Sequence, residues 1–245
     1  MNKNILLIAY KFYPAGGVGS RRWIKFCKYL VKQGFHVHII SGNFSPEYNT
    51  NAWEADVKEL KSITIYNVGS SLLPDYIFSN NRSKVQKLLS IPLRAYLKLC
   101  TSDIDYAQGW GKEFVPKAVE IINKFEIKTM IATGAPFSVL ALASMIKIQN
   151  SEIKFIADLR DPWIEDYNNK RFPEKLSSIE KFSKNYIFEN QVLNCADEIL
   201  TVSKTLINMM TNNHGLLLDK FHYLPNGFDP ADYEQGTNAK EDEVV

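Results

Sequence analysis

The opening of the chain has the pattern of one βαβ unit, and this pattern constrains the fold more than any other feature. Residues 4–9 form a continuous apolar run, which is typical of a strand buried on both faces of a parallel sheet. A glycine-rich loop follows, and Ser20 is a candidate N-cap for a helix whose apolar residues recur at helical spacing. Gly34 ends this helix, and residues 35–41 form a second strand.

The rest of the chain continues this alternation. Further strands are predicted at residues 63–68, 128–132, 154–158, 198–202 and 221–224, and helices at 52–60, 82–100, 112–125, 136–148, 174–195 and 204–214. The helix at 136–148 is apolar nearly all round, so we expect it to be buried. The alternation predicts an α/β fold with a Rossmann-like, doubly wound parallel sheet, in three layers and in a single domain over residues 1–229.

Composition excludes several classes of protein. Of the 245 residues, 45% are hydrophobic and 23% are charged, which argues against a disordered, collagen-like or coiled-coil chain. The three cysteines lie far apart and form no CxxC pair, so neither a disulfide scaffold nor a cysteine zinc site is expected. His36 and His38 alternate on a strand without a suitably spaced third ligand, so we expect no metal.

Charge is distributed unevenly along the chain, although the net charge is only +2. No acidic residue precedes Glu47, whereas the chain beyond residue 228 is rich in acids. This asymmetry predicts an anionic ligand or surface near the basic part.

No apolar run approaches the roughly 20 residues of a membrane span, and no signal peptide is evident, so we expect a cytoplasmic protein. The basic amphipathic segment 82–100 favours a helix that packs on its own domain with its charges in water, with peripheral contact with the inner face of the membrane as the alternative.

The loop after the first strand is the first candidate site. Glycines such as Gly16 and Gly17 let the backbone approach a ligand closely, and the helix that follows offers free N–H groups to an anion. Arg21 lies in its first turn, where a bound phosphate or acidic sugar would offset the unfavourable helix dipole. The alternative is a tight turn followed by exposed arginines. The GxGxxG spacing of dinucleotide sites is missing, and the second strand ends in Ser41-Gly42 instead of an acid.

Three other segments end at the same edge of the predicted sheet. Thr133 and Gly134 close one strand before a helix, and Asn226 lies in a turn after the last strand. The third segment is the densest, because it gathers two carboxylates, a guanidinium and an indole: Asp158, Arg160, Asp161 and Trp163. Such a cluster can orient a hydroxyl and stack a sugar ring on the indole. The alternative is an Asp–Arg pair that fixes the loop, because a buried carboxylate needs a partner.

In this order, the segments resemble the N-terminal domain of glycosyltransferase family 4. The resemblance rests on residues 14–21, 155–163, 196–203 and 224–229, with support from 106–110, and covers about residues 2–233. It implies a GT-B fold, in which the first domain mainly binds the acceptor and the second binds the nucleotide sugar. It also implies transfer with retention of anomeric configuration, without a metal or other cofactor. In this reading, Asp158 and Asp161 orient the acceptor hydroxyl, and the other candidates bind substrate.

The expected function is therefore the acceptor side of a sugar transfer to a glycan or lipid-linked acceptor in cell-envelope or capsular polysaccharide synthesis. The second, nucleotide-sugar domain is not found in these 245 residues, and residues 230–245 read as the start of an interdomain linker or a disordered tail. We expect this chain alone to transfer no sugar, and we expect no nucleic-acid partner. Two alternatives stay open: an NAD-dependent oxidoreductase or epimerase, and a non-catalytic module that pairs with a separate subunit.

Overall fold

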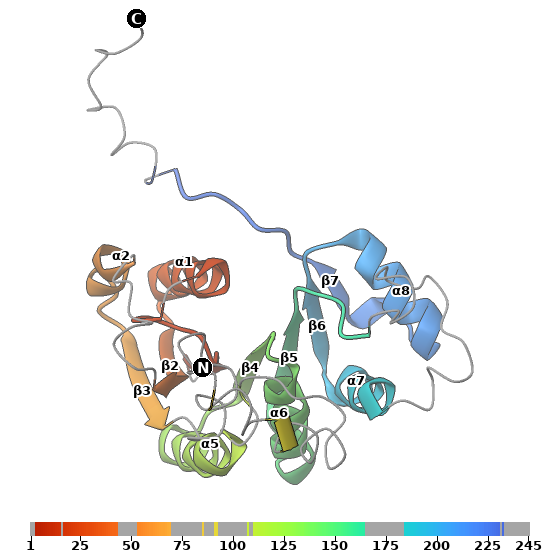
Figure 1. The fold of residues 1–245 in the computed structure, drawn as a ribbon. Helices are drawn as coiled ribbons and strands as arrows, with labels where there is room; N and C mark the ends of the chain where they lie inside the picture. Colours follow the sequence, from red (N-terminus) through yellow and green to blue (C-terminus); the bar gives the residue numbers. More distant parts are fainter. Residues whose placement is uncertain are drawn as a thin grey trace, which may run out of the picture.

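A seven-stranded parallel sheet forms the centre of the molecule (Figure 1). The computed structural model describes residues 3–15, 17–43, 53–69, 85, 91–92, 107, 110–164, 184–230 and 232. The strands are β1 (Asn4–Ile8), β2 (His36–Asn43), β3 (Ile63–Gly69), β4 (Thr129–Gly134), β5 (Lys154–Leu159), β6 (Glu198–Thr201) and β7 (Phe221–Tyr223). Their order is β3-β2-β1-β4-β5-β6-β7, and every neighbouring pair is parallel, which confirms the predicted fold class.

Helices cover both faces of this sheet. They are α1 (Val18–Lys32), α2 (Glu54–Lys58), α5 (Gly111–Phe125), α6 (Phe137–Gln149), α7 (Lys184–Cys195) and α8 (Lys204–His214), with a short 3₁₀ turn η3 (Leu218–Lys220). Helices α1 and α2 lie on one face, and α5, α6 and α7 lie on the other (Figure 1). The three layers predicted from the alternation of strands and helices are therefore present.

The central strand shows why its sequence is a continuous apolar run. Successive side chains of β1 point to opposite faces, so Leu6 and Ile8 pack with the core under α5 and α6, while Ile5 and Leu7 pack with the core under α1. Each of these four residues is buried. Because helices cover both faces, neither set of positions can be polar.

The strand order reverses between β1 and β4. The chain moves outward from β1 to β2 and β3, and then returns to place β4 on the other side of β1. In open parallel sheets, the crevice at the carboxyl ends of two such strands is the preferred place for a ligand. The loops after β1 and β4 are therefore the first places to look for a site.

Two local predictions are wrong. Helix α1 begins at Val18 and not after Ser20, because Gly17 takes a φ of 132°, which favours glycine, and serves as the N-cap; Ser20 is buried inside the helix. Helix α6 is not buried all round, since Met145 and Ile148 are 49% and 63% exposed. The predicted helices at 82–100 and the first part of 174–195 lie almost wholly outside the described residues. Among the helices that the structure describes, none combines the length and apolarity that crossing a membrane requires.

Two histidines, His36 and His38, lie in the first half of β2. The His38 ring pairs through Nδ1 with the Tyr66 hydroxyl at 3.2 Å and through Nε2 with Asn4 Oδ1 at 3.3 Å. The centroid of its ring lies 4.7 Å from that of His36 and 4.1 Å from that of Phe125. Burial, followed by the charge of His36, lowers the pKa of His38 from 6.5 to about 4.

We expect this histidine to make the fold sensitive to mild acid. The unfolded chain protonates His38 near pH 6.5, whereas the folded chain does so only near pH 4, so the unfolded state binds more protons between these values. The stabilisation is present above pH 6.5, and about 3 kcal/mol of it is lost as the pH falls to 4. Urea unfolding across this range measures the effect. His38→Gln should flatten the profile between these pH values, and a slope equal to that of the parent protein would contradict the assignment.

Candidate functional site

The four candidate segments meet at one edge of the sheet. Because all strands are parallel, the loops after β1, β4, β5 and β7 leave from the same side, and Thr133 pairs in register with Asp158 across β4 and β5. Gly17 lies at the start of α1, at the end of the loop that follows β1. Gly16 lies outside the described residues. The structure therefore brings together the segments that the sequence singled out.

Asp158 is a fully buried carboxylate at this edge. Its side chain is 0% exposed, and its carboxylate accepts hydrogen bonds from Trp23 Nε1 at 2.8 Å, Thr133 Oγ1 at 2.8 Å and Arg22 Nη2 at 3.3 Å. The carboxylate is enclosed and already hydrogen bonded, so an acceptor hydroxyl would have to replace one of these donors, and the predicted contact of Asp158 with the acceptor stays a prediction. Thr133, which is 7% exposed, is likewise engaged by Asp158 and not offered to a substrate. Both residues hold the strand ends in place.

Arg22 is the counter-ion of Asp158 and reaches a fourth segment. Its Nη1 donates to Asn226 Oδ1 at 2.9 Å and to the Pro225 carbonyl at 3.3 Å, and its Nη2 donates to the Leu224 carbonyl at 3.0 Å. The guanidinium also lies over the ring of Phe26, 4.6 Å from its centroid. Burial, only partly opposed by the charge of Asp158, lowers the pKa of Arg22. The sequence prediction named Arg21 and passed over Arg22, although Arg22 directly precedes Trp23 on the inward side of the helix.

Arg160 places a second guanidinium against the first turn of α1, at Gly19. Its Nε donates to the Gly134 carbonyl at 3.1 Å, which fixes the side chain across the end of β4. A Cβ atom added to Gly19 would lie 2.6 Å from Arg160 Nη1, so the close approach requires a glycine. Partial desolvation, followed by the charge of Arg160, lowers the pKa of Lys11 in the loop after β1. Two cationic side chains thus lie near the reversal of strand order, and Lys11 was not predicted.

In the loop after β5, the two remaining candidates, Asp161 and Trp163, have different surroundings. Asp161 is exposed and stays available to a ligand. Trp163 is only 5% exposed, and its ring stacks on Phe137 with centroids 5.0 Å apart and an interplanar angle of 9°. The indole is packed in the core beneath the loop, so a sugar that stacks on Trp163 would have to displace Phe137, and this contact stays a prediction.

The two remaining candidates, Arg21 and Asn226, are held by this chain's own groups. Asn226 is exposed but accepts from Arg22, and the Arg21 guanidinium lies 4.3 Å from the ring centroid of Trp53 and pairs with Asp232. Both residues line a shallow hollow of about 130 Å³ between α1 and residues 226–229. Most of its remaining lining is apolar, including Val18, Phe26 and Tyr29.

Comparison with known proteins supports the fold but not an activity. No protein-family model and no curated protein sequence matches this chain. Among solved structures, the N-terminal domain of Candida albicans trehalose-6-phosphate phosphatase has a TM-score of 0.52 at 14% identity, over 98% of this chain and 52% of that chain.

Two further solved structures are similar at lower scores. UDP-GlcNAc 2-epimerase from Neisseria meningitidis has a TM-score of 0.44 at 9% identity, with 90% of this chain and 46% of that chain covered. The lipopolysaccharide glycosyltransferase WaaG has a TM-score of 0.39 at 12% identity, with 97% and 52% covered. This chain therefore spans about half the length of the structures it matches. At these identities, the likeness establishes a Rossmann-like fold and no more.

The buried ion pair makes a quantitative prediction about stability. Arg22→Met should lower the free energy of unfolding by about 3–5 kcal/mol, because it leaves Asp158 buried without its counter-ion. Urea denaturation measures the loss. Lys117→Met is a matched control, since Lys117 pairs with the half-exposed Glu120 and should cost at most about 1 kcal/mol. Asp158→Asn added to Arg22→Met should recover part of the loss; an Arg22→Met protein within 1 kcal/mol of the parent would contradict the role of the pair.

Proposed function

We propose that this chain is the acceptor-side, N-terminal domain of a retaining family 4 glycosyltransferase of the GT-B fold. The reaction would move a sugar from a nucleotide sugar to a glycan or lipid-linked acceptor in cell-envelope or capsular polysaccharide synthesis. Support comes from the ordered motifs of the sequence and from the sheet order, which places these motifs at one edge. The fold likeness to solved structures is compatible with it.

The observation that carries the proposal is the guanidinium of Arg160 over Gly19. A cation held against a glycine-rich loop, near the start of a helix, is suited to phosphate oxygens, because the loop gives close backbone approach and the helix start offers N–H groups. Lys11 adds a second positive charge nearby. In a sugar transfer, this corner would stabilise the negative charge that develops on the departing phosphate.

The other side chains divide into reacting and positioning groups. Exposed Asp161 would accept a hydrogen bond from the acceptor hydroxyl and hold it in line for attack. Asp158, through Thr133 and Arg22, would position the loops without touching substrate. Arg21 and Asn226 would bind substrate only if it displaced their present partners. No general base is assigned, since a retaining transfer can use the leaving phosphate for that proton.

Location and partners follow from the same proposal. A cytoplasmic enzyme would meet its nucleotide-sugar donor in solution, with peripheral membrane contact through residues 82–100 and with neither a metal nor another cofactor. At the end of β2, buried Ser41 donates to Asn67 Oδ1 at 2.8 Å, where an NAD site commonly has an acid for the ribose. This arrangement disfavours the dinucleotide alternative.

Ligand binding tests the proposal directly. Ligand-observed NMR with a panel of hexose 1-phosphates should show binding to this chain, and Arg160→Gln should abolish it. Incubation with UDP-, GDP- or ADP-sugars should give no transfer by this chain alone. Binding of NAD(H), read from tryptophan fluorescence, in the absence of any sugar-phosphate binding would refute the proposal in favour of an oxidoreductase.

A substitution at Gly19 distinguishes an effect on ligand binding from an effect on the stability of the fold. Gly19→Ala should weaken hexose 1-phosphate binding about tenfold or more, because the new methyl group displaces the Arg160 guanidinium. Stability should change by less than about 1 kcal/mol, since the end of a flexible side chain can move. Gly69→Ala is the matched control, because a Cβ there meets nothing within 4 Å. Equal affinities for the two variants would contradict the role of Arg160.

A further inference from the structure

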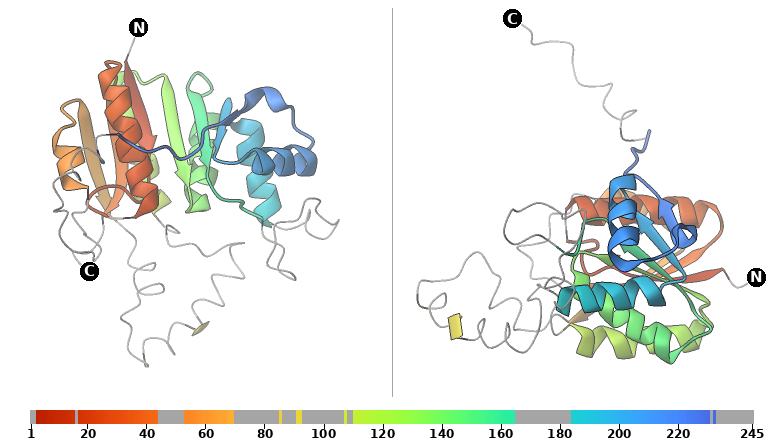
Figure 2. Two further views of the ribbon diagram at one scale, coloured as in Figure 1. Left: turned by 90° about the horizontal axis from the view of Figure 1, so that it is seen from above. Right: turned by 90° about the vertical axis from the view of Figure 1, so that its right-hand side faces the viewer.

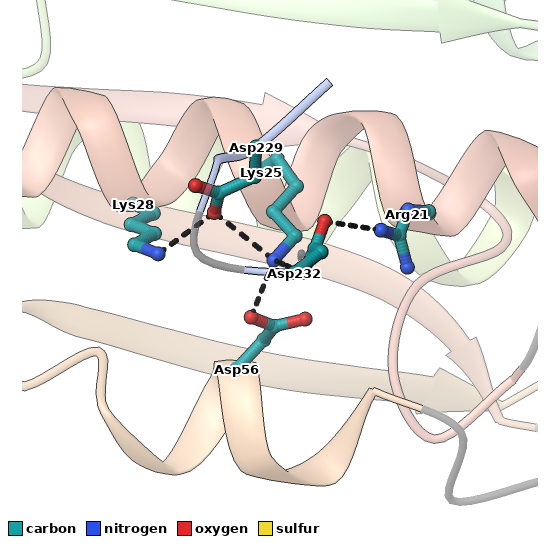
Figure 3. A network of polar contacts seen from close by, with 6 residues as sticks. All are labelled: Arg21, Lys25, Lys28, Asp56, Asp229 and Asp232. Atoms are coloured by element: carbon teal, nitrogen blue, oxygen red, sulfur yellow. Dashed lines mark hydrogen bonds and ion pairs between the residues drawn. The ribbon is translucent and has the colours of Figure 1, made fainter. Parts of the chain in front are cut away.

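The chain that follows β7 does not leave the domain directly. Residues 224–230 and 232, here called the strap, cross from β7 to α1 on the side of the sheet that carries α1 (Figure 2). At the β7 end, the amide of Leu224 donates to the Thr201 carbonyl at 2.8 Å, and Arg22 holds residues 224–226. At the α1 end, the strap contacts three basic side chains of the helix (Figure 3).

Apolar burial contributes little to the attachment of the strap. Pro225, Asn226, Gly227, Phe228 and Pro230 are all exposed, and the largest apolar side chain, Phe228, is 75% exposed. Within the described strap, Asp229 is the one residue in the buried class, at 5% exposure. A segment that buries a carboxylate and exposes its phenylalanine is attached chiefly by charge and hydrogen bonds.

The Asp229 carboxylate lies between two lysines of α1. Its Oδ2 is 2.7 Å from Lys28 Nζ and 3.1 Å from Lys25 Nζ. The side chains of Lys25 and Lys28 are only 12% and 15% exposed, against 4% for Asp229, so these pairs are partly withdrawn from water. They are therefore screened less by salt than pairs on an open surface.

Lys25 extends the contact to a second helix and to the end of the strap. Its Nζ is 2.7 Å from Asp56 Oδ1 of α2 and 2.7 Å from Asp232 Oδ1, and Asp232 also pairs with Arg21 (Figure 3). Oxygen atoms of these three aspartates lie within 4.8 Å of one another, and the ammonium is the cation that they share. Burial alone would lower the pKa of Lys25, but the hydrogen bonds with Asp232, Asp56 and Asp229 outweigh burial and raise it.

We propose that the basic side of α1 is a docking surface for this acidic strap, and that the network of Arg21, Lys25 and Lys28 with Asp56, Asp229 and Asp232 is an ionic latch. With the latch closed, the strap runs along α1 and residues 227–230 and 232 are ordered. With the latch open, the strap is held only by Arg22 and by the β7 pairing, and its outer part moves freely. This inference is independent of the proposed sugar transfer.

The latch is expected to open in two stages, because its ion pairs differ in exposure. Arg21 and Asp232 are 35% and 28% exposed, so raising the salt from 0.1 M to 1 M, which shortens the screening length from about 10 Å to about 3 Å, should weaken this pair first. Loss of the charge on Asp229 removes the buried anchor, which both lysines share, and should release the outer strap at any salt concentration.

Backbone ¹⁵N relaxation on the full chain tests the latch. In the parent protein at low salt, the amides of Gly227, Phe228 and Asp229 should have order parameters near those of the sheet, at about 0.85. Asp229→Asn should lower them to below about 0.6, while Leu224 keeps its sheet-like value as an internal reference. Lys28→Met provides a second way to break the same pair if the first variant does not fold.

The controls decide between the latch and a general loosening of the domain. Glu120→Gln removes an acid that pairs with Lys117 on α5, and it should leave all strap values unchanged. If the outer strap keeps order parameters of about 0.85 in both latch variants, some other contact holds it and the proposal is wrong. The proposal is equally overturned if the strap of the parent protein is already below about 0.6 at low salt.

Discussion

The buried pair of Arg22 and Asp158 is the interaction on which the candidate site depends. One carboxylate at the end of β5 binds the indole of Trp23, the hydroxyl of Thr133 and the guanidinium of Arg22, and the same guanidinium holds the chain that follows β7. Four segments that are distant in the sequence are thus fixed through two side chains. A buried pair of this kind rarely adds much net stability over an apolar one, but either partner alone is costly, so the arrangement specifies one geometry.

A second group of ion pairs within the chain lies around α1. The absence of acids before Glu47 suggested an external anion, yet three basic residues of α1 meet carboxylates that come mainly from the far end of the chain. An uneven distribution of charge along the sequence shows which charged residues are close in the sequence, but not which are close in space. Residues 21–28 and 229–232 become neighbours because the strap crosses from β7 back to α1, and that path is set by the fold (Figure 2).

The sequence predicts which segments form the candidate site more reliably than it predicts which side chains of these segments face a ligand. Strand-end loops share one edge in any parallel sheet, so the four segments followed from the strand pattern. Which side chains face a ligand did not follow. Asp158 and Trp163 are residue types often used to bind sugars, but one is enclosed by donors and the other is stacked on Phe137. Conversely, Arg160 lies against Gly19 with its side chain bonded to the Gly134 carbonyl, a contact across two strands.

The sequence by itself determined the α/β class, the positions of the described strands and the three layers, because strand and helix periods are local properties that burial imposes on every residue. Only the tertiary structure decided which charges are paired, which aromatic rings are covered and which cations remain near the reversal of strand order. The charge pairs depend on contacts between residues more than a hundred positions apart, such as Arg22 with Asp158 and Lys28 with Asp229. The stacking of Trp163 on Phe137 and the bond of Arg160 to Gly134 join different segments of the chain, and no local pattern encodes such contacts.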